Sequence, residues 1–142
     1  MRFLALVGTV AFFCLFGAVA QAASLRVAPI SLDLPSGTSA SVVRVWNDDS
    51  APVQVQIRVF KWTQRNGQDV LEPTRDVVAS PPMTQLAPGT ENLIRVVRTS
   101  TTPVNGRESY RLLIDQLPDP GQARPGTVSV LVRHAIPLYF AE

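Results

Sequence analysis

The segment Thr127–Phe140, TVSVLVRHAIPLYF, decides how the fold of this 142-residue chain is interpreted. Apolar residues alternate with other residues along it, and the side chains of an extended strand point to opposite faces in turn. We therefore predict a strand over residues 127–138. Its faces would carry two rows: Val128, Val130, Val132, His134 and Ile136 on one, and Ser129, Leu131, Arg133 and Ala135 on the other.

The row of valines has two interpretations. The valines either face the core of their own domain, as in most alternating strands, or form an exposed apolar edge. The pattern alone favours the core, although Leu131 then lies on the face that is left in water. An apolar edge without a cover is a surface for pairing with another chain. Because a strand near the end of a small β domain is a natural edge, we take this row as the candidate working surface.

The rest of the chain also predicts strands, and no segment has a convincing helical period. About seven short strands, separated by turn signals, are typical of an immunoglobulin-like antiparallel β-sandwich. We expect all-β structure in one domain, with loops over residues 72–80, 99–106 and 118–126. The predicted strands are 25–34, 41–46, 53–59, 69–71, 92–98, 109–117 and 127–138.

Two local signals shape this prediction. Pro29 interrupts the first strand, and a proline inside a strand indicates an edge or a kink where the chain changes sheets. Asn66-Gly67 favours a hairpin turn of type I′, which needs positive φ at both central residues.

The N-terminal segment has the pattern of an export signal. Arg2 precedes an apolar run over residues 3–20, and Ala20-Gln21-Ala22 supplies small residues at the cleavage positions. We predict a signal peptide over residues 1–22 and a domain over 23–142. Cleavage after Ala23 and an uncleaved membrane anchor are the alternatives. Removal of the signal also removes Cys14, the only cysteine, so we expect no disulfide and no thiol chemistry.

Charge and composition exclude several classes of function. Without Arg2, the 13 basic residues become twelve, against 11 acidic ones, so binding to nucleic acid is not supported. His134 has no second histidine or mature cysteine with which to hold a metal, and no serine lies in a nucleophile elbow. Asp48-Asp49 is typical of a turn. We expect no enzyme activity, no catalytic residue, no metal and no cofactor.

Five phrases in order resemble the N-terminal domain of the PapD-like periplasmic pilus chaperones, and they span the whole mature chain. The phrases are Ser24-Leu25 with 30–35 (ISLDLP), 45–48 (VWND), 81–83 (PPM) with 86–89 (LAPG) and 94–96 (IRV), 107–114 (RESYRLLI) with Leu117-Pro118, and 136–140 (IPLYF).

The resemblance implies a periplasmic chaperone that lends a strand to pilus subunits whose own immunoglobulin-like fold lacks its last strand. By position, the lent residues would be Val128, Val130, Val132 and Ile136. Backbone pairing would supply affinity and the apolar side chains would fill the groove of the subunit. The implied partners are pilus subunits and an outer-membrane usher. Self-association through the edge is a further expectation, and stable membrane insertion after signal cleavage is not expected.

The chain departs from the family pattern in two places. The family anchors the carboxylate at the C-terminus of the subunit with two basic residues, but the matching positions here hold Ser31 and Pro137, so the anchor is unassigned. Arg26 and Arg133 lie nearby in sequence, and we interpret them as solvated strand charges. The family also carries a second β domain, whereas this chain ends at Ala141-Glu142. We expect a truncated reading frame, a fragment or a shortened variant.

A rival hypothesis stays open beside the chaperone. The chain would then be a secreted structural or adhesive immunoglobulin-like module, or an inactive remnant, whose last strand is internal. In that case Val130→Glu would cost several kcal/mol of fold stability through a buried unpaired charge.

Overall fold

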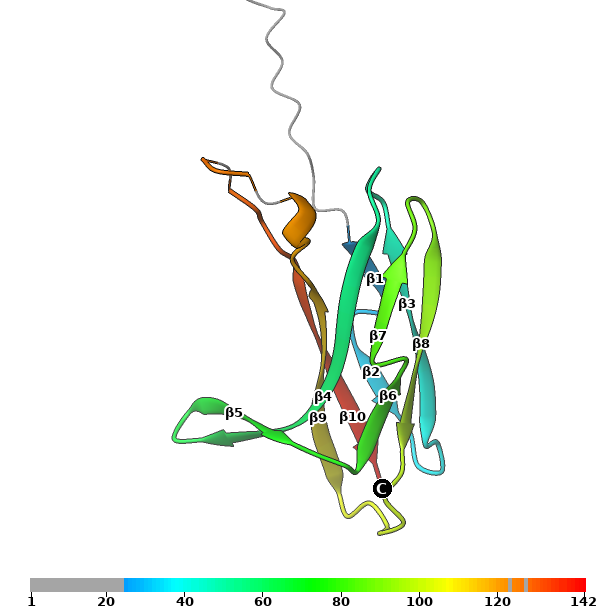
Figure 1. Cartoon of the computed structure of the whole chain (residues 1–142). Coiled ribbons are helices and arrows are strands. Elements are labelled where there is room, and N and C mark those ends of the chain that lie inside the picture. The colour runs from blue at the N-terminus through cyan, green and yellow to red at the C-terminus, as the bar shows by residue number, and fades with distance from the viewer. Residues whose placement is uncertain (1–24, 123, 127) are drawn as a thin grey trace, which may run out of the picture.

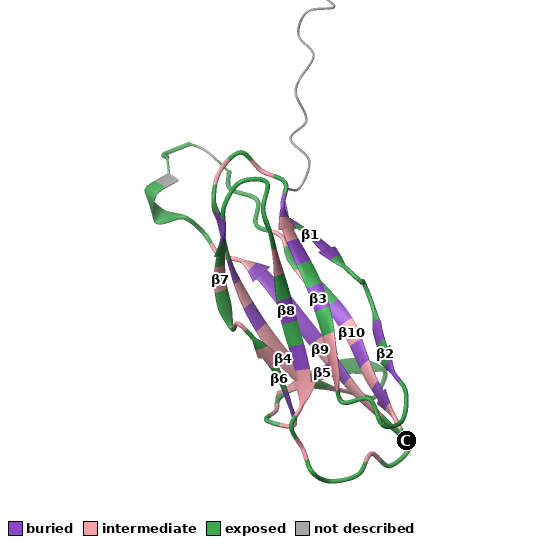
Figure 2. Ribbon diagram, turned by 90° about the vertical axis from the view of Figure 1, so that its right-hand side faces the viewer, coloured by how far each residue is buried: buried purple, intermediate pink, exposed green. Residues whose placement is uncertain are grey.

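The strands form two sheets that pack face to face, and each sheet buries one face of its strands (Figure 1). The structure is a computed structural model and describes residues 25–122, 124–126 and 128–142. The predicted signal peptide, residues 1–22, lies outside the described residues. Buried and exposed positions alternate along β3 and β8 in Figure 2, as expected of strands that cover a core with one face.

The two sheets have four and six strands. The four-stranded sheet has the order β1 (Leu25–Ala28), β3 (Ala40–Asn47), β8 (Glu91–Arg98) and β6 (Val77–Ser80). The six-stranded sheet has the order β2 (Leu32–Leu34), β10 (Arg133–Ala141), β9 (Arg107–Gln116), β4 (Val53–Arg65) and β5 (Gln68–Pro73), with β7 (Met83–Leu86) also beside β4. β2 pairs with β10 in parallel, and the other pairs are antiparallel. The immunoglobulin-like β-sandwich is confirmed, with ten strand segments among the described residues instead of about seven.

The chain changes sheets where the proline signal predicted. β1 lies in one sheet and β2 in the other, so the expected first strand is two strands separated by Pro29. Two other short strands were not predicted: β6 lies in the expected loop 72–80, and β7 lies between the predicted strands 69–71 and 92–98. Each has only four residues, which is too short for a period of two to stand out in the sequence.

The Asn66-Gly67 turn is confirmed. Asn66 has φ of 53° and Gly67 has φ of 76°, so both central residues take the positive φ that a type I′ turn requires. The turn closes the β4–β5 hairpin, which projects away from the two sheets in Figure 1.

The core lies between the sheets and is built from aliphatic side chains with two aromatic rings. Tyr110 and Phe140 meet edge to face, with ring centroids 5.9 Å apart. The fully buried residues with the largest side chains are Tyr110, Phe140, Leu86, Ile94, Leu112, Ile114, Ile136, Leu138, Val43, Val45, Val55 and Val77.

A polar network closes one end of this core. Arg98 donates two hydrogen bonds to the Glu108 carboxylate, at 2.9 and 2.8 Å, and Tyr110 donates its hydroxyl to the same group at 2.9 Å. Arg98 also bonds the carbonyls of Ser100 and Thr102 in the following loop. The hydrogen bonds from Arg98 lower the pKa of Glu108, burial acts against them, and the Tyr110 hydroxyl lowers the pKa further.

We expect Glu108→Gln to lower the free energy of unfolding at neutral pH by about 1–3 kcal/mol, because a charge-assisted network loses its charge. The folded-state pKa of Glu108 lies below 4.5. Its contribution is therefore full above the unfolded-state pKa and is lost as the pH falls through the folded one. Urea unfolding at a series of acidic pH values should show a smaller acid-dependent loss in the variant. Glu72→Gln, which removes an exposed ion pair with Arg65, is the control. If the free energy of unfolding falls equally with decreasing pH in wild type, Glu108→Gln and Glu72→Gln, the prediction is contradicted.

Candidate functional site

The segment before β10 is exposed. Val128 is 90% exposed and Val130 is 78% exposed, whereas Val132 is partly buried against the core. In Figure 1 this orange segment extends away from the two sheets. The structure therefore places two of the three predicted valines on the surface and the third at the boundary of the fold.

The last strand starts later than predicted. It runs over Arg133–Ala141 instead of 127–138, and Thr127 lies outside the described residues. The cause is the end of the neighbouring strand. β9 ends at Gln116, and beyond it the Leu117 N–H continues the pairing with β4 by donating to the Gln54 carbonyl at 2.8 Å. Among the described strands, none is paired with residues 128–131.

Gln116 forms the last link between β9 and the exposed segment. Its N–H donates to the Val132 carbonyl at 2.9 Å, and its side-chain carbonyl oxygen accepts from the Val132 N–H at 3.3 Å. Among the residues that the structure describes, no hydrogen bond involves the backbone of residues 128–131. Their N–H and C=O groups are therefore open to another strand.

Ile136 does not belong to the exposed row. It is 2% exposed and packs in the core with Leu138 and Phe140, all on the inward face of β10. The alternation of the sequence is real, but only its second half pairs with β9 and faces the core. The predicted binding role of Ile136 is thus opposed by its packing, because its side chain already fills this domain.

His134 has a structural environment. Its Nε2 atom lies 2.9 Å from the Leu25 carbonyl, so the ring links β10 to the start of β1 in the opposite sheet. Among the described residues, no group of three or more histidine, cysteine or acidic side chains is placed to hold a metal ion. Within the same residues, no helix has the length and apolar character needed to cross a membrane.

The outer face of the six-stranded sheet carries arginines that stack on aromatic rings. Three guanidinium groups lie 5.5, 3.8 and 3.9 Å from ring centroids, in the pairs Arg58–Phe60, Arg107–Tyr139 and Arg111–Trp62. Such cation–π contacts hold long side chains flat against the sheet. This face is therefore both basic and ordered.

Ser31 and Pro137, the positions without a charge, are neighbours in space. They directly precede Leu32 and Leu138, which pair across β2 and β10. Pro137 also pairs with Arg111 on β9, so the Arg111 side chain lies on the same outer face next to it.

The two other arginines are committed elsewhere. Arg26 forms an exposed ion pair with Asp48, and Arg133 binds Asp115. Both arginines are more than half exposed, which agrees with their interpretation as solvated strand charges.

We expect Val130→Glu to change the free energy of unfolding of the free chain by no more than about 0.5 kcal/mol, because the side chain is in water. Ile136→Ala, in the same segment, should cost about 2–5 kcal/mol, because it leaves a cavity in the core. Urea denaturation of both variants checks this. A loss of several kcal/mol in Val130→Glu would favour the rival interpretation, in which the valines are internal.

The family comparison agrees with the resemblance seen in the sequence. A family model described as the pili and flagellar-assembly chaperone, PapD N-terminal domain, matches residues 24–141. None of the curated proteins matches the chain in sequence.

Several solved structures share the fold. A chain in the CsuC–CsuE chaperone–tip adhesion subunit pre-assembly complex, from archaic chaperone-usher Csu pili of Acinetobacter baumannii, is 29% identical with a TM-score of 0.73, over 84% of this chain and 52% of that one. The Salmonella enterica SafA pilin in complex with the SafB chaperone is 20% identical with a TM-score of 0.66, over 85% of this chain and 55% of that one. The E. coli chaperone DraB is 22% identical with a TM-score of 0.62, over 83% of this chain and 55% of that one. The last two show the fold alone. This chain spans about half the length of the chains it matches.

Proposed function

We propose that this chain, which belongs to the PapD N-terminal domain family of pili and flagellar-assembly chaperones, binds pilus subunits and stabilises them by lending them a strand. The lent strand would be residues 128–132, which we call the donor segment. Its apolar side chains would enter the open groove of a subunit while its backbone pairs with the strands at the edges of that groove.

One observation carries this proposal: Val128 and Val130 are exposed in front of a strand that is otherwise well packed. Val128 and Val130 leave apolar surface in water and bury little of it in their own domain. Burying each would contribute about 1.5–3 kcal/mol before the costs of association. Among the described residues, the backbone of residues 128–131 has no hydrogen-bond partner that binding would have to displace, whereas Val132 is bonded to Gln116.

The donated row is shorter in this proposal than the sequence predicted. Val128 and Val130 would enter the subunit, and Val132 would form the base of the row, partly held by the core. Ile136 would act indirectly, by fixing β10 in its own sandwich.

The relatives support this class of function. The complex named for CsuC and CsuE joins a chaperone to a tip adhesion subunit, and the SafA and SafB structure joins a pilin to a chaperone. For this chain we propose a pilus subunit and an outer-membrane usher as partners. Self-association through the donor segment when no subunit is bound remains a further prediction.

The place of action would be the periplasm, reached by the signal peptide over residues 1–22, and the working domain would be residues 23–142. The function needs no cofactor and no catalytic residue, because strand pairing makes and breaks only non-covalent contacts.

The rival is a structural or adhesive immunoglobulin-like module, or an inactive fragment. The exposure of Val130 weighs against valines that face the core, on which that rival depends.

Arg111 is our candidate for the carboxylate anchor. Ser31 and Pro137 carry no charge, and Arg111 lies beside Pro137 with its guanidinium 3.9 Å from the centroid of Trp62. A stacked guanidinium keeps hydrogen-bond donors free at its edge, and these suit a carboxylate.

We expect Val130→Glu to reduce capture of a pilin at least tenfold, since about 1.4 kcal/mol corresponds to a factor of ten and a charge in an apolar groove costs more. The measurement is co-purification of the tagged chain with a pilus subunit from the same genome, co-expressed in the periplasm. Ser129→Glu places the same charge at an exposed neighbouring position, on the opposite face of the segment, and should retain more capture. Unchanged capture by Val130→Glu, with an unchanged melting temperature, would contradict the donor role.

We expect Arg111→Gln to reduce the same capture about tenfold or more, in line with about 1.5–3 kcal/mol for a hydrogen bond to a charged group. Arg111→Lys should recover part of it, because the charge is kept. Arg44→Gln, an exposed arginine on β3 of the other sheet, is the control. A subunit whose terminal carboxylate is blocked should bind wild type and Arg111→Gln alike; a persisting difference would remove Arg111 from the anchor.

A further inference from the structure

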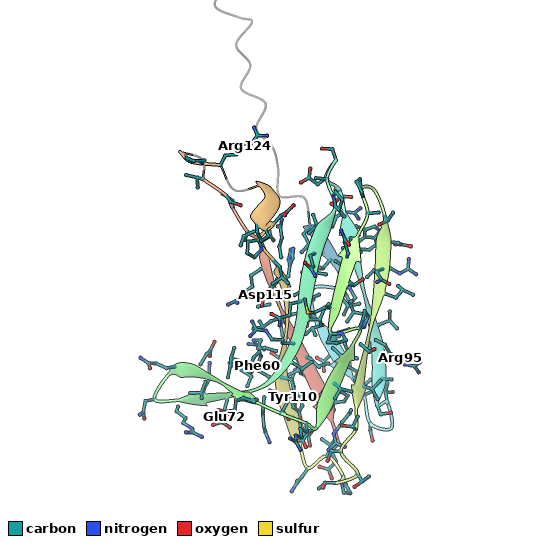
Figure 3. All side chains as sticks on the ribbon, in the orientation of Figure 1. Phe60, Glu72, Arg95, Tyr110, Asp115 and Arg124 are labelled. Atoms are coloured by element: carbon teal, nitrogen blue, oxygen red, sulfur yellow. The ribbon has the colours of Figure 1, made fainter. Side chains whose placement is uncertain are left out.

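Three strands of the six-stranded sheet meet at one carboxylate. Asp115 on β9 accepts a hydrogen bond from Arg58 Nη2 on β4 at 2.7 Å through Oδ2, and one from Arg133 Nε on β10 through Oδ1. Each carboxylate oxygen thus holds a different neighbouring strand. Figure 3 places Asp115 toward the end of the sandwich from which the donor segment emerges, and Tyr110 further toward the other end.

The backbone pattern brings Asp115 and Arg133 together at the boundary of the donor segment. The bond from the Gln116 N–H to the Val132 carbonyl makes Asp115 and Arg133 a pair without hydrogen bonds between their own backbones. Side chains in such pairs lie closer together than in the alternate pairs. Arg133 is the first residue of β10, so the ion pair holds the strand at its first residue.

Burial distinguishes this carboxylate from most others of the sandwich. The Asp115 side chain is 11% exposed, whereas those of Arg58 and Arg133 are 41% and 61% exposed. In the pairs Arg26–Asp48, Arg65–Glu72 and Arg107–Asp33, both partners are exposed. Burial raises the pKa of Asp115, but the hydrogen bonds from Arg133 and Arg58 together lower it more, so the group stays charged at neutral pH.

We propose that Asp115 is a positioning residue for the donor segment: it fixes Arg133 and thereby sets where the fixed strand ends and the free segment begins. The inference rests on the proposed function, because a boundary of this kind matters only if the segment is presented to a partner. It assigns to Asp115 a role in binding without any contact to the subunit.

The physical reason is register. A slip of one residue between β9 and β10 exchanges the two faces of a strand. It would turn Ser129 and Leu131 toward the subunit in place of Val128 and Val130. A fixed base also reduces the conformational freedom that the segment loses on binding, and such preorganisation raises affinity without a new contact.

The first measurement needs no partner. Amide hydrogen exchange of the Gln116 and Val132 N–H groups reports local opening at the boundary. In Asp115→Asn we expect both amides to exchange about tenfold faster, equivalent to about 1.4 kcal/mol. The Ile57 N–H, bonded to the Pro82 carbonyl at 2.8 Å, is an internal reference on β4 and should change little. Asp33→Asn, which removes the exposed pair with Arg107, is the matched control.

A double-variant cycle tests whether Asp115 acts through Arg133. Arg133→Gln should give the same acceleration as Asp115→Asn, the two together should give no more than either alone, and Arg133→Lys should restore part of the protection. Additive effects, or equal acceleration of the Ile57 amide, would overturn the positioning role and leave Asp115 as a general stabiliser of the fold.

Capture of the co-expressed pilin then separates this inference from the proposed function. At a temperature at which all variants are folded, Asp115→Asn should lower capture, and Val130→Glu should lower it at least tenfold. If Val130→Glu lowers capture and Asp115→Asn does not, the positioning role is overturned while the donor role stands. If neither variant changes capture, the donor role itself fails.

Discussion

The last backbone hydrogen bond between β9 and β10, from the Gln116 N–H to the Val132 carbonyl, is the constraint on which the proposed donor segment depends. Below it, β10 is an ordinary core strand, with Ile136, Leu138 and Phe140 packed inward. Beyond it, β9 has ended and the chain stays bonded to Gln54 of β4, so that no described strand pairs with the backbone of residues 128–131. The same alternating sequence therefore has two roles, decided by whether a neighbouring strand runs alongside.

Much of the fold is readable from local sequence because it rests on local chemistry. The period of two over residues 53–59, the positive φ of Asn66 and Gly67, and the break at Pro29 all act within a few residues, and each predicts its element correctly. The four-residue strands β6 and β7 escape this reading, because their pairing is set by β8 and β4 and not by their own pattern.

The candidate site was less predictable for a related reason. The row from Val128 to Ile136 keeps one period throughout, so nothing within it marks the change from exposed to buried at Arg133. That change follows from the end of the β9–β10 pairing at Gln116 and Val132, which is a property of the tertiary structure. The ion pairs of Asp115 join residues 57 and 18 positions apart, and no local motif announces them. The family is readable from the sequence and the exposure of Val128 and Val130 agrees with one of the two interpretations of the row, whereas the ion pairs of Asp115 are not readable from it.

The flanks of β10 determine how the domain bears load. Along its whole length β10 is paired with β9, and at Leu138, Tyr139 and Phe140 it is also paired with β2, in parallel. Hydrogen bonds of the antiparallel β9–β10 ladder run across the strands. Tension applied along the chain from residue 128 is therefore carried as shear by many bonds at once, instead of opening them one after another.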